Sequence, residues 1–176
     1  MRKLLNEELG RPTIEEYANV EKLPVALVLD NVRSAQNVGS FFRTADAFGI
    51  ERIELCGITS TPPNRELHKT ALGSELSVAW GYHESTLECV AALRADGYRI
   101  IAIEQIEGAV MLNNMRVESG VKYALVFGNE VDGVAQEVAD IVDGAIEIPQ
   151  IGTKHSLNVS VSAGVVMWEL FRQLRG

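Results

Sequence analysis

The sequence lacks the short motifs that mark the commonest nucleotide-binding folds. No G-x-G-x-x-G follows the first predicted strand, and no G-x-x-x-x-G-K-[ST] occurs in the 176 residues. The usual dinucleotide fingerprint and the phosphate-binding P-loop are therefore missing. No histidines and cysteines share metal-ligand spacing either, so we expect no metal site.

Long apolar runs and cysteines are also scarce. There is no stretch of about 18 apolar residues and no apolar N-terminal leader, so we expect neither a membrane span nor secretion, and we place the protein in the cytoplasm. Cys56 falls in a strand pattern and Cys89 in a helical one. We interpret both as reduced core residues.

Positive charge is in short supply. Lysine and arginine number 16 against 24 acidic residues, which gives a net charge of −8. Such a balance argues against broad, non-specific binding to nucleic acid, although a local basic patch remains compatible with it.

The apolar pattern that is present predicts an α/β fold with a mainly parallel sheet flanked by helices, because short strands alternate with helices of about a dozen residues. Residues 1–22 read as a helical appendage with a helix start near Thr13, and residues 23–176 as a single domain. The expected strands are 25–29, 53–56, 78–80, 99–103, 121–127 and 145–148. The expected helices are 38–48, 64–72, 84–95, 135–141 and a last one from residue 156 or 157.

Three polar loops follow predicted strands, after Leu29, Phe127 and Ile148. In parallel sheets ligands bind beyond the carboxyl ends of the strands, so these loops are the candidate site.

The loop after Ile148 leads into the most apolar helix. Pro149 ends the strand, and Ser156 stands where an N-cap would. Such a helix start suits an anionic group. Asn158 has two interpretations: a solvated first-turn residue, or a polar residue in a buried helix that must find a partner.

The other two loops carry an arginine and a carboxylate. Asn37 and Arg43 are six residues apart, about 240° around one helix. Arg43 lies on a helix that otherwise looks buried, so we expect an anionic partner, with Glu130 the natural one and a plain ion pair the alternative. Gly128 would let a flat ligand approach the backbone, although an ordinary β–α turn explains it equally well.

Together these segments resemble the three motifs of the SpoU (TrmH-type) RNA 2′-O-ribose methyltransferases of the SPOUT superfamily. The matching residues are Asn37, Gly39, Arg43 and Gly49; then Phe127, Gly128, Glu130 and Gly133; then Pro149, Gly152, Ser156, Leu157, Asn158 and Ser160.

This resemblance implies a C-terminal trefoil knot, a homodimer, and S-adenosylmethionine as cofactor. The catalytic set it implies is Asn37, Arg43, Glu130, Ser156 and Asn158. The cofactor-binding set is Ile103, Phe127, Gly128, Ile148, Pro149, Gly152, Ser156 and Leu157.

The family suggests Arg43 as the base that takes the proton of a ribose 2′-hydroxyl. Because arginine is normally always protonated, that role needs help from Glu130 or from an RNA phosphate. The physical alternative is that Arg43 binds the neighbouring phosphate and stabilises the developing alkoxide.

The RNA contacts we expect form a local basic rim, with solvated surface charges as the alternative interpretation. Its members are Arg33, Arg65, Lys69 and Lys154. Because no extra RNA-binding domain is visible, we expect tRNA rather than rRNA as substrate. A catalytically silent dimer that binds RNA or cofactor remains the alternative from another class, and a small-molecule nucleotide-binding module is a third.

Overall fold

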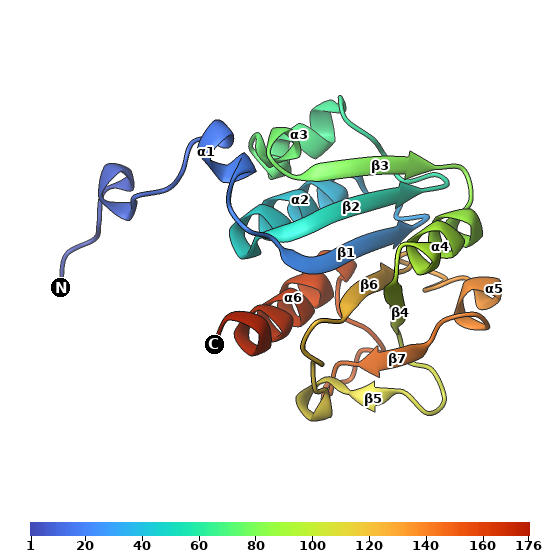
Figure 1. The fold of residues 1–176 in the computed structure, drawn as a ribbon. Coiled ribbons are helices and arrows are strands. Elements are labelled where there is room, and N and C mark those ends of the chain that lie inside the picture. Colours follow the sequence, from blue (N-terminus) through green and yellow to red (C-terminus); the bar gives the residue numbers. More distant parts are fainter.

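A seven-stranded sheet forms the centre of the computed structural model, which describes residues Met1–Gly176 (Figure 1). Every neighbouring pair of strands is parallel, in the order β3-β2-β1-β6-β4-β7-β5. The strands are β1 (Leu23–Asp30), β2 (Ile50–Cys56), β3 (Ala79–His83), β4 (Tyr98–Ile103), β5 (Val110–Met111), β6 (Lys122–Phe127) and β7 (Gly144–Glu147). The predicted α/β class with a mainly parallel sheet is confirmed.

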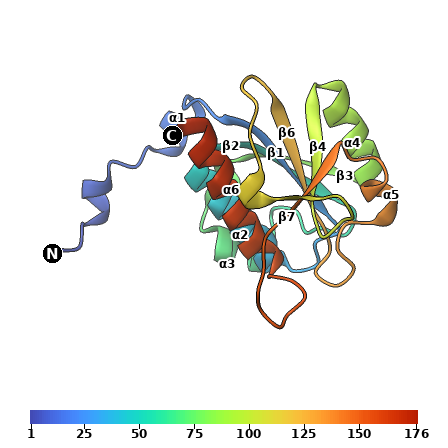
Figure 2. The ribbon, with the colours of Figure 1, turned by 90° about the horizontal axis from the view of Figure 1, so that it is seen from below.

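Helices cover both faces of this sheet, as the two views in Figures 1 and 2 show. The larger core cluster joins one face to α2, α3 and α6, and the smaller joins the other face to α4 and α5. The helices are α2 (Ala35–Phe48), α3 (Arg65–Ala71), α4 (Thr86–Ala95), α5 (Gln136–Ala139) and α6 (Val159–Arg175).

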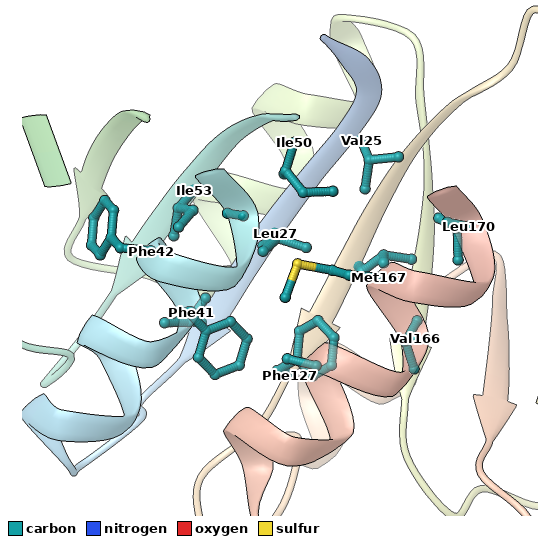
Figure 3. Packing of buried hydrophobic residues seen from close by; sticks show 14 of the residues in the cluster. Val25, Leu27, Phe41, Phe42, Ile50, Ile53, Phe127, Val166, Met167 and Leu170 are labelled. Carbon is teal, nitrogen blue, oxygen red and sulfur yellow. The ribbon is translucent and has the colours of Figure 1, made fainter. Parts of the chain in front are cut away.

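The larger core lies where α2 and α6 meet the central strands (Figure 3). The ring of Phe41 meets the ring of Phe127 edge-on at a centroid distance of 5.1 Å, and Met167 from α6 fills the space beside them. All three side chains are buried, and burial of each contributes roughly 1.5–3 kcal/mol. This packing fixes α2 and α6 on the sheet whose strand ends carry the site.

The last helix differs from its prediction. It begins at Val159 with Asn158 as N-cap, whereas the sequence predicted a start at Ser156 or Leu157. Within one chain Val161 and Trp168 of this helix are each 52% exposed, so burial of the helix on all sides stays a prediction that depends on a partner subunit.

Two further elements depart from expectation. Helix α5 covers only Gln136–Ala139, where residues 135–141 were predicted. The two-residue strand β5 was not predicted, because so short a run carries no period.

The N-terminal stretch begins apart from the sheet and runs toward it to reach α1 (Ile14–Ala18) (Figure 1). Thr13 caps α1 and forms the expected capping box with Glu16. The hydroxyl of Tyr17 donates to the Asp46 carbonyl at 2.8 Å, which ties α1 to α2. None of the helices is long and apolar enough to cross a membrane.

Candidate functional site

A cleft of about 520 Å³ opens at the carboxyl ends of β4, β6 and β7. This volume lies within the range of small-molecule and cofactor sites. The cleft is lined by Ile103, Glu104, Gln105, Phe127, Gly128, Asn129, Glu130, Val131, Asp132, Gly133, Ile146, Glu147, Ile148, Gln150, His155, Ser156, Leu157, Asn158, Val159 and Ser162.

The Glu130 carboxylate, which lies at the cleft, accepts hydrogen bonds from the start of α2. One oxygen accepts from the backbone N–H of Arg33 at 2.8 Å. The other accepts from the N–H of Ser34 at 3.0 Å and from the side-chain amide of Asn37 at 2.8 Å. Partial desolvation raises the pKa of Glu130, but these hydrogen bonds outweigh it and hold the pKa below its ordinary value. Glu130 therefore stays charged and fixes the side chain of Asn37.

Asn158 carries the connection on to α6. Its side-chain amide donates to the Asn37 side-chain oxygen at 3.2 Å. Its own side-chain oxygen accepts from the backbone N–H groups of Ser160 at 3.0 Å and Val161 at 3.3 Å, as an N-cap does. Asn158 is thus both a helix cap and the partner of Asn37, and the chain Glu130–Asn37–Asn158 joins all three predicted loops.

Gly128 sits where two backbone segments touch. A Cβ built on Gly128 would lie 2.0 Å from the carbonyl carbon of Gly133 and 2.1 Å from the nitrogen of Val134. Asn129 and Gly133 exchange two backbone hydrogen bonds, of 2.9 and 3.0 Å, that close this turn. The glycine after β6 is therefore required by the turn itself, and Gly128 is also one of the residues that line the cleft.

Arg43 lies elsewhere than predicted. It is an exposed residue of α2, and the partners of Glu130 are Asn37 and two backbone N–H groups. The expected ion pair between Arg43 and Glu130 is therefore wrong. The prediction assumed that Arg43 is buried with its neighbours Phe42 and Ala45, but Arg43 occupies the solvent side of the helix.

Most of the predicted cofactor residues line the cleft. Pro149 and Gly152 are exposed and stand outside the lining. Ser156 lines the cleft but does not cap α6. The lining members of the predicted set are Ile103, Phe127, Gly128, Ile148, Ser156 and Leu157.

Several acidic and amide residues of the cleft were missed. Glu104 accepts from the N–H of Val134 at 3.1 Å, and Gln105 donates its side-chain amide to the His155 carbonyl at 2.6 Å. Both residues directly follow β4. Because ligands bind beyond the carboxyl ends of parallel strands, the loop after β4 could have been predicted as part of the site in the same way as the other three loops.

The residues of the predicted basic rim come from three segments of the chain, with Arg65 and Lys69 together on α3. Arg33, Arg65 and Lys154 are exposed, and Lys69 pairs with Glu66 at 2.6 Å. The Glu66 carboxylate also accepts from Gln36 at 3.2 Å. The charge of Lys69 is thus already partly compensated within the chain.

Comparison with known proteins gives consistent matches. The model of the SpoU rRNA Methylase family matches residues 24–168. A tRNA (guanosine(18)-2′-O)-methyltransferase of Thermus thermophilus is 32% identical over 166 residues, which are 94% of this chain and 84% of that protein.

Solved structures agree with this match. The TrmH/SpoU tRNA modifying enzyme of A. aeolicus superposes with a TM-score of 0.81 at 26% identity, over 92% of this chain and 81% of that one. The AdoMet-bound rRNA methyltransferase of Sinorhizobium meliloti gives a TM-score of 0.80 at 29% identity. That match covers 90% of this chain, which spans only 60% of the length of the rRNA methyltransferase.

Proposed function

Because this chain belongs to the SpoU rRNA Methylase family, we propose that it transfers a methyl group from S-adenosylmethionine to the 2′-hydroxyl of a ribose in RNA. The observation that carries this proposal is the hydrogen-bonded chain Glu130–Asn37–Asn158 at the mouth of the cleft. It links the first motif segment, through Asn37, to the two motif loops that line a pocket of cofactor size.

The cleft suits S-adenosylmethionine chemically. Ile103, Ile146 and Leu157 offer apolar surface to an adenine ring, and Gly128 contributes backbone to the lining. Glu104 and Asp132 bring negative charge to the lining. Such charge favours the positive sulfonium and ammonium groups of this cofactor.

When bound, S-adenosylmethionine supplies a methyl group on a positively charged sulfur. The chain's own task is to hold the ribose oxygen in line and to stabilise the charge that develops on it. Glu130 keeps the Asn37 amide oriented at the cleft. Arg43 has no anionic partner among the ion pairs of the chain, so its guanidinium is available for an RNA phosphate.

The substrate we propose is tRNA. The tRNA (guanosine(18)-2′-O)-methyltransferase of Thermus thermophilus, 32% identical over 94% of this chain, supports this proposal. We propose residues 23–176 as the catalytic unit, residues 1–22 as its appendage, and the cytoplasm as its location.

We further propose a homodimer built on α6, with the segment from Pro149 into α6 threaded as a trefoil knot. Val161, Val165 and Trp168 follow one another at helical spacing and are all exposed. Trp168 also packs beside Phe48 of α2, at a centroid distance of 5.9 Å, so the apolar surface spans two helices. An exposed apolar surface of this kind marks an interaction site.

Sedimentation of Val165→Lys tests the dimer. A lysine on this face would have to be desolvated in the interface, so we expect monomers at concentrations at which the unaltered protein is dimeric. Leu87→Lys on α4 is the control, because Leu87 is similarly exposed on the opposite face of the sheet. A dimer unaffected by Val165→Lys would refute the α6 interface.

Transfer of labelled methyl to unmodified bulk tRNA and rRNA, followed by nucleoside analysis, tests the activity. We expect a 2′-O-methylated nucleoside in tRNA, and its loss in Arg43→Ala. Lys122→Ala is the matched control, because it removes an exposed cation at the start of β6, whereas the cleft lies at the end of that strand. Cofactor binding without transfer to either RNA pool would point to a helper protein or another acceptor, and no cofactor binding at all would favour the silent dimer.

A further inference from the structure

Two exposed aromatic side chains stand on the edge strand β3. Trp80 is 37% exposed and Tyr82 is 49% exposed, although their partners in the register, Ile53 and Leu55 of β2, are fully buried. Strand β3 is the last of the sheet on its side (Figure 1). Residues two apart on a strand share one face, so the two rings lie on the same side of this edge.

The two rings border a hollow of about 420 Å³. Its other lining residues are Gly57, Thr59, Ser60 and Thr61, from the loop that follows β2. The hollow thus combines aromatic rings with the hydroxyl groups of Ser60 and Thr61, which can donate or accept, whereas the Thr59 hydroxyl is bonded within the fold. This combination suits a flat, polar-edged ring such as a nucleobase.

The hollow is held in shape by hydrogen bonds. The Tyr82 hydroxyl donates to the Gly57 carbonyl at 3.1 Å. Gly57 has a φ of +60°, and a Cβ on it would lie 2.1 Å from the side-chain oxygen of Asn31. That same oxygen accepts from the N–H of Ile58 at 3.2 Å. The ring of Tyr82 is therefore positioned before any ligand binds, which reduces the entropy cost of binding.

The loop beneath the hollow is joined to the loop that carries the candidate active site. The Thr59 hydroxyl accepts from the N–H of Val32 at 3.0 Å. Asn129, which follows β6, donates its side-chain amide to the Asn31 carbonyl at 2.9 Å. Arg33, which follows Val32 in the chain, donates its backbone N–H to the Glu130 carboxylate. One short segment, residues 31–33, thus contacts both the hollow and the cleft.

We propose that Trp80 and Tyr82 bind an unpaired base of the RNA substrate by stacking, at the sheet edge that β2 and β1 separate from the strands of the cleft. This inference rests on the proposed function and names how its substrate is held. Stacking on aromatic rings contributes affinity without positive charge. It therefore accounts for RNA binding by a chain whose net charge is −8 and whose Lys69 is already paired.

Tryptophan fluorescence tests the stacking directly, because the chain has only two tryptophans, Trp80 and Trp168. The probe is a single-stranded oligoribonucleotide, compared with the same strand annealed to its complement. We expect saturable quenching by the single strand, none by the duplex, and loss of the quenching in Trp80→Phe, which retains Trp168. Equal quenching by both RNAs, or quenching that survives in Trp80→Phe, would overturn the proposal.

Steady-state kinetics on tRNA provide the second measurement. In the double variant Trp80→Ala/Tyr82→Ala we expect KM for RNA to rise about five- to a hundredfold, the range for loss of a stacked base. The Kd for S-adenosylmethionine should stay unchanged, and Trp80→Phe should restore most of the loss. Leu87→Ala is the control, because Leu87 is 38% exposed on α4.

The two proposals fail differently. An unaltered protein that transfers no methyl group would refute the proposed function, while the quenching experiment would still decide whether Trp80 binds a base. If the double variant still transfers methyl groups and its KM for RNA is unchanged, the stacking proposal is refuted while the proposed function stands. A variant that changes only the oligomeric state would assign the β3 edge to a protein contact and would also refute the proposal.

Discussion

Replacement of Glu130 by glutamine tests the centre of the site at almost constant volume. The Glu130 carboxylate accepts three hydrogen bonds, from the N–H groups of Arg33 and Ser34 and from the Asn37 amide. A glutamine has one oxygen and one NH2 group, so in either orientation at least one donor faces another donor. The remaining bonds also lose their charge assistance.

The expected cost follows from this count. Hydrogen bonds to charged groups contribute about 1.5–3 kcal/mol each, but Glu130 is partly exposed and the glutamine retains some of them. We therefore expect Glu130→Gln to lower the free energy of unfolding by about 1–2 kcal/mol at pH 7. For a domain of this length that corresponds to a fall in Tm of about 2–8 °C. The turnover number should fall as well, because Asn37 loses its fixed orientation.

The pH dependence gives the sharper test. Because the hydrogen bonds lower the pKa of Glu130, its contribution is fully present above the ordinary glutamate pKa and is lost as pH falls through the lowered value. The stability difference between the two proteins should be constant from about pH 6 to 8 and shrink on acidification below about pH 4.3.

Urea denaturation at fixed protomer concentration measures this difference. Glu107→Gln is the control, because Glu107 is exposed. Equal stability of Glu130→Gln and the unaltered protein at pH 7 would refute the reasoning. So would a difference of the same size at pH 7 and at the lowest pH at which both remain folded.

Two glycine substitutions test close contacts. In Gly39→Ala the new Cβ would lie 2.1 Å from the Thr70 hydroxyl and 2.2 Å from the Leu67 carbonyl. We therefore expect the free energy of unfolding to fall by about 1–3 kcal/mol. A Tm equal to that of the unaltered protein would contradict this packing of α2 on α3. In Gly128→Ala the backbone clash with Gly133 should displace the turn and weaken S-adenosylmethionine binding at least about tenfold by calorimetry, since a 1.4 kcal/mol loss already has that effect. Gly152→Ala meets no atom within 4 Å and should leave that affinity unchanged; equal losses in both variants would exclude the clash as the cause.

Much of the fold could be predicted because its signals are local. The apolar runs of β1 and β6 are continuous, as expected of strands covered on both faces. The end of α2 at Gly49 was predicted from the glycine alone, and Gly49 indeed has a φ of +65°. Such features depend on neighbours in the sequence and need no knowledge of the rest of the chain.

The errors concern features that depend on distant parts of the chain. Ser156 and Asn158 are both good N-caps by composition, and only the contact with Asn37 favours Asn158. Arg43 was assigned a buried partner because its neighbours are apolar, but which side of α2 faces solvent is decided by α3 and α6. The exposure of Val161, Val165 and Trp168 on α6 likewise cannot be recognised from the sequence, because apolar side chains there look the same whether they face the sheet or solvent.

The hydrogen bonds at the site have a consequence for how the protein matures. Asn37 and Glu130 are 93 residues apart, and Asn37 and Asn158 are 121 apart. Contacts of such long separation form late, because much of the chain must first be brought together. During synthesis the pocket therefore cannot exist until α6 has left the ribosome and docked. Truncation before Val159 removes Ala163, Val166, Met167 and Leu170 from the larger core, so we expect an unstable chain that binds no cofactor, and activity reports completion of the fold.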